Sequence, residues 1–241
     1  FAADGHDLLL LARRLPELQA LCTELAQRHG IQARPIACDL SAKSELDALL
    51  VEVQGLELDY LVNNAGFGTV GSFAELPAER EAAMIELNVT ALARLTRAVL
   101  PGMIARRRGS ILNLGSTAGF PPGPYMATYY ATKAFVNSFS EALSYELRGS
   151  GVSVTVSCPG PTSTEFGAVS GVDKTRLFDR SVASAASVAH DAYRAMQRRQ
   201  VMVVHGLMNW LLVQSLRISP RFLVRVITAR LNRAPSGNQK P

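Results

Sequence analysis

The 241-residue sequence contains few cysteines and histidines, and none of them lie close together in the chain. The three cysteines, Cys22, Cys38 and Cys158, form no C-x-x-C pair, so they fit reduced core thiols better than a disulfide framework or a zinc site. The four histidines lack metal-ligand spacing as well. The sequence therefore gives no support to metal catalysis.

The sequence also lacks a signal peptide and an uninterrupted run of about 18 apolar residues. It predicts neither secretion nor a membrane-spanning helix, and we expect a cytoplasmic location. A chain of this length with 48% hydrophobic residues can bury one large core, which favours a single domain.

No acidic residue follows Asp191, whereas nine lysines and arginines do. We predict a basic amphipathic helical extension at 207–233 and a flexible tail at 234–241. Such a helix can lie peripherally on an anionic membrane, cover a substrate pocket or form a subunit interface, and the sequence leaves these alternatives open. Nucleic acid is not an expected partner, because the basic residues lie on an apolar helix without a recognised binding module.

Short apolar runs, such as 7–12 and 152–160, alternate with helical patterns, such as 78–106 and 125–149. The apolar runs do not alternate with polar residues, which is typical of parallel strands buried on both faces. We predict an α/β fold with a doubly wound, Rossmann-like parallel sheet over residues 1–206. Ligands of such sheets bind beyond the carboxyl ends of the strands.

The stretch ATYYATKAF at 127–135 places Tyr129 four residues before Lys133, on the same face of a predicted helix. A nearby ammonium favours phenolate and lowers the pKa of the phenol, so the pair is a candidate acid. Because Y-x-x-x-K occurs by chance in many helices, other motifs must decide between catalysis and packing.

Further motifs accompany this pair, and together they resemble those of the classical short-chain dehydrogenase/reductase family. They are NNAG at 63–66, LNVTA at 87–91, NLGSTAG at 113–119, YYATK at 129–133 and PGPTST at 159–164. Tyr129 follows Ser116 by 13 residues, the usual separation in this family. The resemblance implies an enzyme that transfers a hydride between a nicotinamide cofactor and a carbonyl or alcohol.

The resemblance also implies the roles of four side chains. Tyr129 matches the general acid, and Lys133 matches the residue that lowers its pKa and binds the nicotinamide ribose. Ser116 matches the donor that orients the substrate oxygen. Asn88 matches the residue that links Lys133 to solvent through a water. From the residues alone, Ser116 can equally be a helix cap or turn serine, and Asn88 can simply cap or bend its helix.

The end of an early strand bears on the choice of cofactor. Arg13 and Arg14 follow the run LLLLA, and guanidinium groups pair with a 2′-phosphate, so we predict NADP, with NAD as the alternative. Two solvated arginines that begin a helix are the simpler interpretation. The remaining cofactor-binding positions that the resemblance implies are Asp39, Leu40, Asn64, Ala65, Gly66, Tyr129, Lys133, Pro159, Gly160 and Thr162.

One departure from the family pattern concerns the amino terminus. The first strand and the T-G-x-x-x-G-x-G loop should precede Phe1, because Phe1–Gly5 resembles the end of the first helix. That loop directs backbone N–H groups toward the pyrophosphate. We therefore expect this chain to be a fragment of a longer polypeptide, and the full protein to be the enzyme.

The predicted function is reduction or oxidation of an apolar small molecule, such as a ketone, a 3-oxoacyl group or a steroid-like compound. Phe120, Pro121, Tyr125, Phe166 and the carboxyl-terminal extension are the expected pocket residues. The alternative is a non-catalytic nucleotide-binding or regulatory protein that keeps the fold. A sugar epimerase or dehydratase is disfavoured by the short chain after Gly160. The resemblance further implies a homo-oligomer formed through the long helices.

Overall fold

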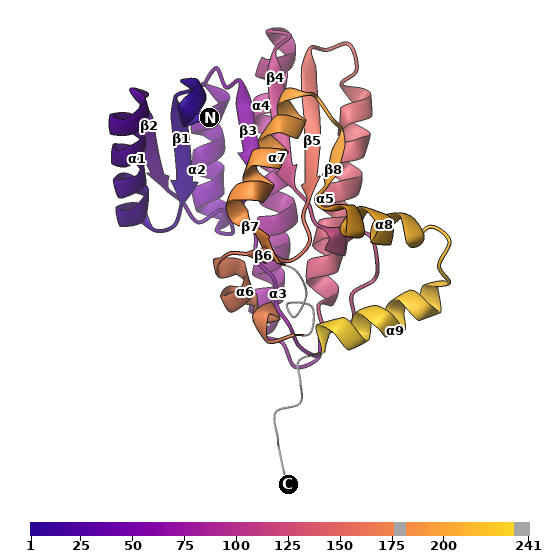
Figure 1. Ribbon diagram of the computed structural model, residues 1–241. Helices are drawn as coiled ribbons and strands as arrows, with labels where there is room; N and C mark the ends of the chain where they lie inside the picture. Colours follow the sequence, from indigo (N-terminus) through magenta and orange to yellow (C-terminus); the bar gives the residue numbers. More distant parts are fainter. Residues whose placement is uncertain (176–181, 234–241) are drawn as a thin grey trace. The chain divides into compact units, whose positions relative to one another are not determined.

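The computed structural model describes residues 1–175 and 182–233 (Figure 1). They form two compact units, with the boundary between Val53 and Gln54. The predicted flexible tail at 234–241 lies outside the described residues.

The first unit contains two parallel strands with helices. Its elements are the 3-10 helix η1 (Ala2–Asp4), β1 (Leu8–Ala12), α1 (Leu15–His29), β2 (Ala33–Ala37) and α2 (Lys43–Gln54). β1 pairs with β2 in register from Leu8 opposite Ala33 to Ala12 opposite Ala37. Gly30, at φ 67°, ends α1 in the left-handed conformation, as its position after a helical pattern predicts.

The second unit is built on a four-stranded parallel sheet in the order β3-β4-β5-β8. These strands are β3 (Tyr60–Asn63), β4 (Gly109–Leu114), β5 (Val152–Cys158) and β8 (Met202–Val204). β6 (Thr162–Ser163) and β7 (Ala183–Ser184) form a separate parallel pair. Six of the seven residues of β5 are buried, which explains why its sequence lacks a polar alternation.

Helices cover both faces of this sheet (Figure 1). α4 (Leu92–Ala105) and α5 (Ala127–Glu146) pack on one face, and α7 (Ala185–Gln197) packs on the other. The other helical segments are α3 (Ala78–Ile85), η2 (Glu86–Ala91), η3 (Thr117–Gly119), α6 (Glu165–Ser170), η4 (Val172–Lys174), α8 (Leu207–Ser215) and α9 (Arg221–Asn232). The predicted α/β class, with a doubly wound parallel sheet, is confirmed.

Two predicted helical patterns differ in detail from the structure. The pattern at 78–106 is divided by the π-helix η2, and α4 contains Pro101. Pro101 removes a single intrahelical hydrogen bond, and the side chain is exposed, so α4 continues to Ala105. The extension at 207–233 forms two helices because Pro220 restarts the chain as the N-cap of α9.

Candidate active site

The predicted site residues of the second unit lie at the carboxyl ends of its parallel strands. Asn64 follows β3, Ser116 follows β4 by two residues, and Pro159 follows β5 directly. A hydrogen bond from the backbone N–H of Thr117 to the carbonyl oxygen of Pro159, at 3.0 Å, joins the last two loops. These residues therefore lie together at the carboxyl-terminal edge of the sheet, where ligands of parallel α/β sheets bind.

The first two turns of α5 bring Tyr129 and Lys133 to this edge, and both side chains are buried. Lys133 Nζ lies 5.9 Å from the centroid of the Tyr129 ring and donates a hydrogen bond to the carbonyl oxygen of Leu114 at 2.6 Å. A hydrogen bond also joins the Tyr129 and Ser116 side chains. Three of the four predicted catalytic side chains are thus grouped together.

The pKa of Tyr129 differs from the sequence-based prediction. Burial raises this pKa above its usual value, the hydrogen bond with Ser116 acts to lower it, and Tyr130 acts to raise it. The prediction of a lowered pKa is wrong for this state of the molecule. The reason is that desolvation dominates, while Lys133 directs its ammonium to a backbone carbonyl. At neutral pH Tyr129 therefore holds its proton, as a proton donor must.

Burial has the opposite effect on the charge of Lys133. Desolvation lowers the pKa of Lys133 to about 8, and the neighbouring Cys158 acts to raise it. Burial likewise raises the pKa of the Cys158 thiol to about 12. At neutral pH the structure thus keeps an ammonium group in a largely desolvated position beside a protonated phenol.

Asn88, the fourth predicted catalytic residue, lies in the π-helix η2 and is almost fully buried. Its Nδ2 donates to the carbonyl oxygen of Phe67 at 2.9 Å and to Thr132 Oγ1 at 3.1 Å, and its Oδ1 accepts from the backbone N–H of Phe67 at 3.2 Å. Asn88 therefore fixes the loop after β3 to the turn of α5 that carries Lys133. The water-mediated link from Asn88 to Lys133 stays a prediction.

The loop after β3 fits a bound nucleotide. Asn64, Ala65 and Gly66 are exposed. A Cβ atom on Gly66 would lie 3.0 Å from Asn88 Oδ1 and 3.7 Å from Lys133 Nζ. Glycine thus keeps open the space directly beside a buried cationic donor. Such a cradle suits the polar ribose and nicotinamide part of a dinucleotide.

The other predicted cofactor positions of this unit lie in the loop after β5. Thr162 begins β6 and donates through Oγ1 to the carbonyl oxygen of Gly160 at 3.0 Å. The carbonyl oxygen of Pro159 accepts from the Thr117 side chain at 3.2 Å, in addition to the backbone bond above. These hydrogen bonds fix the conformation of the loop, and the Pro159 carbonyl oxygen already accepts two of them.

In the first unit, Arg13 and Arg14 follow β1, and both are exposed. Arg14 is the N-cap residue of α1, and its Nε lies 3.7 Å from Glu17 Oε1, so the simpler interpretation of helix-starting arginines also fits. Asp39 follows the parallel β2. Its pKa is lowered, chiefly by hydrogen bonds from Ser41 and also by the charge of Arg13. Half-buried Leu40 follows it.

Apolar side chains surround Tyr129, and only part of this set was predicted. The centroids of the Phe166 and Tyr129 rings lie 5.2 Å apart. Phe120, in contrast, packs against the cluster of Leu92 and Val136, and its place in the substrate pocket stays a prediction. Sequence reasoning missed Phe67, Val70, Met84, Met126 and Val172, which have no motif of their own.

Comparison with known proteins decides the family. The sequence model of the family described as short chain dehydrogenase matches residues 1–175, well over half of the chain. The chain belongs to this family. The prediction of a short-chain dehydrogenase/reductase is therefore confirmed at the level of the family.

Relatives of this short-chain dehydrogenase include an uncharacterized oxidoreductase of Myxococcus xanthus, 39% identical over 170 residues, or 68% of this chain and 66% of the relative. A very-long-chain 3-oxoacyl-CoA reductase of Coprinopsis cinerea is 38% identical over 154 residues, or 62% of this chain and 45% of the relative. The matched region therefore spans less than two thirds of each relative's length.

A solved structure resembles this short-chain dehydrogenase over almost its whole length. It is a short-chain dehydrogenase from Sphingobium yanoikuyae in complex with NADPH, 30% identical, with a TM-score of 0.81. The match covers 99% of this chain and 92% of that one. Because one α/β fold accounts for both units, the predicted Rossmann-like single domain is confirmed.

Proposed function

We propose that this short-chain dehydrogenase transfers a hydride between NADPH and the carbonyl or alcohol group of a small apolar substrate. The observation that carries the proposal is the grouping of Ser116 and Tyr129, joined by a hydrogen bond, with the buried ammonium of Lys133 beside the Tyr129 ring. Burying a lysine is costly and gains little for a purely structural purpose, which favours a catalytic role over packing.

In this proposal the cofactor supplies the hydride, and the residues of the chain handle the proton and the charge. Ser116 donates a hydrogen bond to the substrate oxygen, and the Tyr129 hydroxyl gives its proton to that oxygen in the reductive direction. The Lys133 ammonium then stabilises the phenolate that remains. Asn88 holds the loop next to Lys133, where the predicted water would return a proton.

The surroundings of Tyr129 support an apolar substrate. Tyr129 lies in a cluster with Met84, Met126, Tyr130 and Val172, against which Phe166 packs. Such a lining favours a ketone, a 3-oxoacyl chain or a steroid-like molecule over a polyol. The relative from Coprinopsis cinerea, described as a very-long-chain 3-oxoacyl-CoA reductase, supports an acyl chain among these classes.

The cofactor proposal of NADP gives a direct test. Replacing Arg13 and Arg14 together with alanine is expected to weaken NADPH binding by at least about 10- to 100-fold, because even one charge-assisted hydrogen bond to the 2′-phosphate contributes on the order of 1.5–3 kcal/mol. NADH binding should change little. Fluorescence titration of the two cofactors measures both affinities.

Arg28→Ala is the matched control, since Arg28 is an exposed arginine at the other end of α1. It should leave both affinities as they are in the wild type. Equal losses of NADPH and NADH affinity in the Arg13→Ala, Arg14→Ala variant would contradict 2′-phosphate recognition by these residues.

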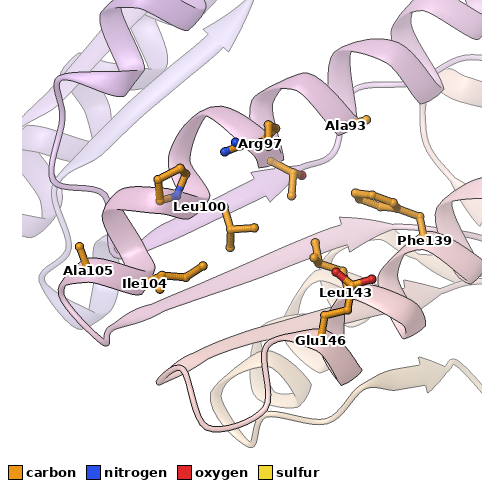
Figure 2. Close-up of a pocket in the computed structure, with 10 residues that line it drawn as sticks. Ala93, Arg97, Leu100, Ile104, Ala105, Phe139, Leu143 and Glu146 are labelled. Atoms are coloured by element: carbon orange, nitrogen blue, oxygen red, sulfur yellow. The ribbon is translucent and has the colours of Figure 1, made fainter.

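We also propose that the chain forms a homo-oligomer through α4 and α5. A cavity of about 650 Å³ lies between these helices, with apolar lining side chains that include Leu100, Ile104 and Leu143 (Figure 2). Arg97 on α4 and Glu146 on α5 also line it. These opposite charges on one surface suit a self-complementary two-fold interface.

Sedimentation velocity tests the oligomer. The wild type is expected to sediment as a dimer or larger species, and Ile104→Asp as a monomer, because a carboxylate cannot be buried unpaired in an apolar interface. Phe73→Asp, at an exposed position outside this cavity, should sediment like the wild type. A monomeric wild type would overturn the proposal.

A further inference from the structure

We propose that the exposed side chains of α8, α9 and the segment between them form a docking surface for an anionic lipid membrane, here termed the C-terminal patch (residues 207–230). It is separate from the catalytic proposal and does not depend on it. In Figure 1 the two helices follow one another at the carboxyl-terminal end of the second unit.

The arrangement of α9 is the first argument, because two of its three buried residues are polar. Its buried positions are Val224, Thr228 and Asn232. Thr228 Oγ1 lies 2.7 Å from the carbonyl oxygen of Val224 in the same helix and 2.9 Å from that of Pro122, and its single proton serves these two acceptors. Asn232 Nδ2 donates to the carbonyl oxygen of Pro124 at 3.0 Å. Asn232 Oδ1 accepts from the Tyr130 hydroxyl at 3.0 Å. Polar contacts with fixed partners thus hold α9 in place.

The opposite face of α9 presents large apolar side chains to the outside. Phe222 is 58% exposed and Ile227 is 55% exposed, with Leu223 and Val226 also exposed. An amphipathic helix in water normally buries such residues and exposes the polar ones. The large apolar side chains that α9 leaves exposed indicate that another apolar phase covers this face.

The apolar surface continues along α8 and the connection to α9. Leu207 and Met208 are strongly exposed, Trp210 is 47% exposed, and Ile218 is 87% exposed. Val213 is the only buried residue of α8. Two consecutive helices therefore both expose large apolar side chains. Single apolar residues scattered over a surface would not produce such a continuous patch.

The charge of the patch identifies the kind of partner. Every charged residue of 207–233 is an arginine, and Arg217, Arg221, Arg225 and Arg230 are exposed. Exposed arginines around large apolar side chains match an anionic headgroup layer above an acyl region. A second copy of the patch would place arginines against arginines. A lid over the substrate is disfavoured because the inner face of α9 is polar.

The mode of binding is peripheral. Within 1–175 and 182–233, no helix combines the length and the hydropathy that a membrane crossing requires. We infer that α8 and α9 lie in the interface, with Trp210 and Phe222 entering the boundary of headgroups and acyl chains.

Trp210 makes the test direct, because it is the only tryptophan of the sequence. The full chain is mixed with vesicles of phosphatidylcholine alone or of equal parts phosphatidylcholine and phosphatidylglycerol. With the anionic vesicles we expect a blue shift of Trp210 emission and co-sedimentation, both reduced at high salt. Neutral vesicles should bind far less.

Variants separate the two components of the surface. Phe222→Ser with Ile227→Ser should abolish co-sedimentation, and Arg221→Gln with Arg225→Gln should weaken it about 25-fold, or about fivefold per arginine. Phe73→Ser and Arg198→Gln, at exposed positions outside the patch, are the controls and should bind like the wild type. Circular dichroism checks that each variant is folded.

Three results would overturn the proposal. The first is a folded wild type whose Trp210 emission and sedimentation do not respond to anionic vesicles. The second is equal binding by the arginine variant and the wild type. The third is self-association through the patch, in which Phe222→Ser with Ile227→Ser dissociates an oligomer that does not bind vesicles.

Discussion

Replacing Tyr129 with phenylalanine is expected to lower the turnover number by about 10²- to 10⁴-fold, the usual contribution of a general acid. The phenylalanine ring keeps the contacts with Phe166 and Met126 but has no proton to give to the substrate oxygen. NADPH affinity should change by less than about tenfold, since the Lys133 ammonium and the loop at Asn64–Gly66 remain. Steady-state kinetics and a fluorescence titration measure the two quantities.

Two other tyrosines of α5 are controls for this variant. Tyr145→Phe removes a hydroxyl from an exposed side chain near the end of the helix and should not affect turnover. Tyr130→Phe leaves Asn232 Oδ1 without its donor and should cost on the order of 1–3 kcal/mol of stability, with a much smaller effect on turnover. If turnover in Tyr129→Phe equals that of the wild type, the residue is not the acid, and a non-catalytic role becomes the better interpretation.

Replacing Lys133 with methionine is expected to abolish turnover and yet stabilise the fold at neutral pH. The ammonium is desolvated, and its pKa falls from 10.5 to about 8, which corresponds to a penalty of about 3 kcal/mol for burying the charged form. The variant also loses the hydrogen bond to the Leu114 carbonyl, which offsets about 1 kcal/mol of the stability gained by removing the buried charge. Below pH 8 the variant should therefore be more stable by about 2 kcal/mol.

The sign of the pH dependence follows from proton binding. Between pH 8 and 10.5 the unfolded chain keeps a proton on Lys133 that the folded chain has lost, so the stability contributed by this group rises with pH. Tyr129 and Cys158, whose pKa values are raised, oppose this trend at high pH in both proteins. Because Tyr129 and Cys158 titrate in both proteins, subtracting the unfolding free energy of the wild type from that of the variant largely cancels their contributions. The resulting stability advantage of the variant should shrink from pH 8 to 10.5.

Urea unfolding across this pH range measures that difference. A variant that is less stable than the wild type at pH 7, with normal turnover, would show that Lys133 is a structural residue. The expected combination of a more stable fold with lost turnover is the signature of a residue kept for function at a cost in stability.

The sequence predicted the features that depend on local pattern and spacing. Apolar runs between helical patterns indicated the parallel α/β sheet, and the four-residue step from Tyr129 to Lys133 placed both on one helix face. Ser116 was identified through the family resemblance, in which it precedes Tyr129 by 13 residues. The loop after β4 and the first turn of α5 bring the two side chains together. The roles of these residues in catalysis remain proposals.

Features that depend on burial and on distant contacts could not be predicted in this way. The raised pKa of Tyr129 follows from desolvation, which exists only once α5 is packed. The hydrogen bond between Tyr130 and Asn232 joins residues 102 positions apart, with no motif to signal it. The orientation of α9 likewise depends on the carbonyl groups of the loop at 122–124 that lie against Thr228 and Asn232.

The most direct test of the central claim follows the hydride itself. The chain is incubated with NADPH that carries deuterium at the reactive position of the nicotinamide, and with an apolar 3-oxoacyl thioester or a bulky ketone. The account predicts one deuterium on the carbinol carbon of the product, and none with Tyr129→Phe in the same time. Binding of NADPH without deuterium in any product would contradict it and would identify a nucleotide-binding protein.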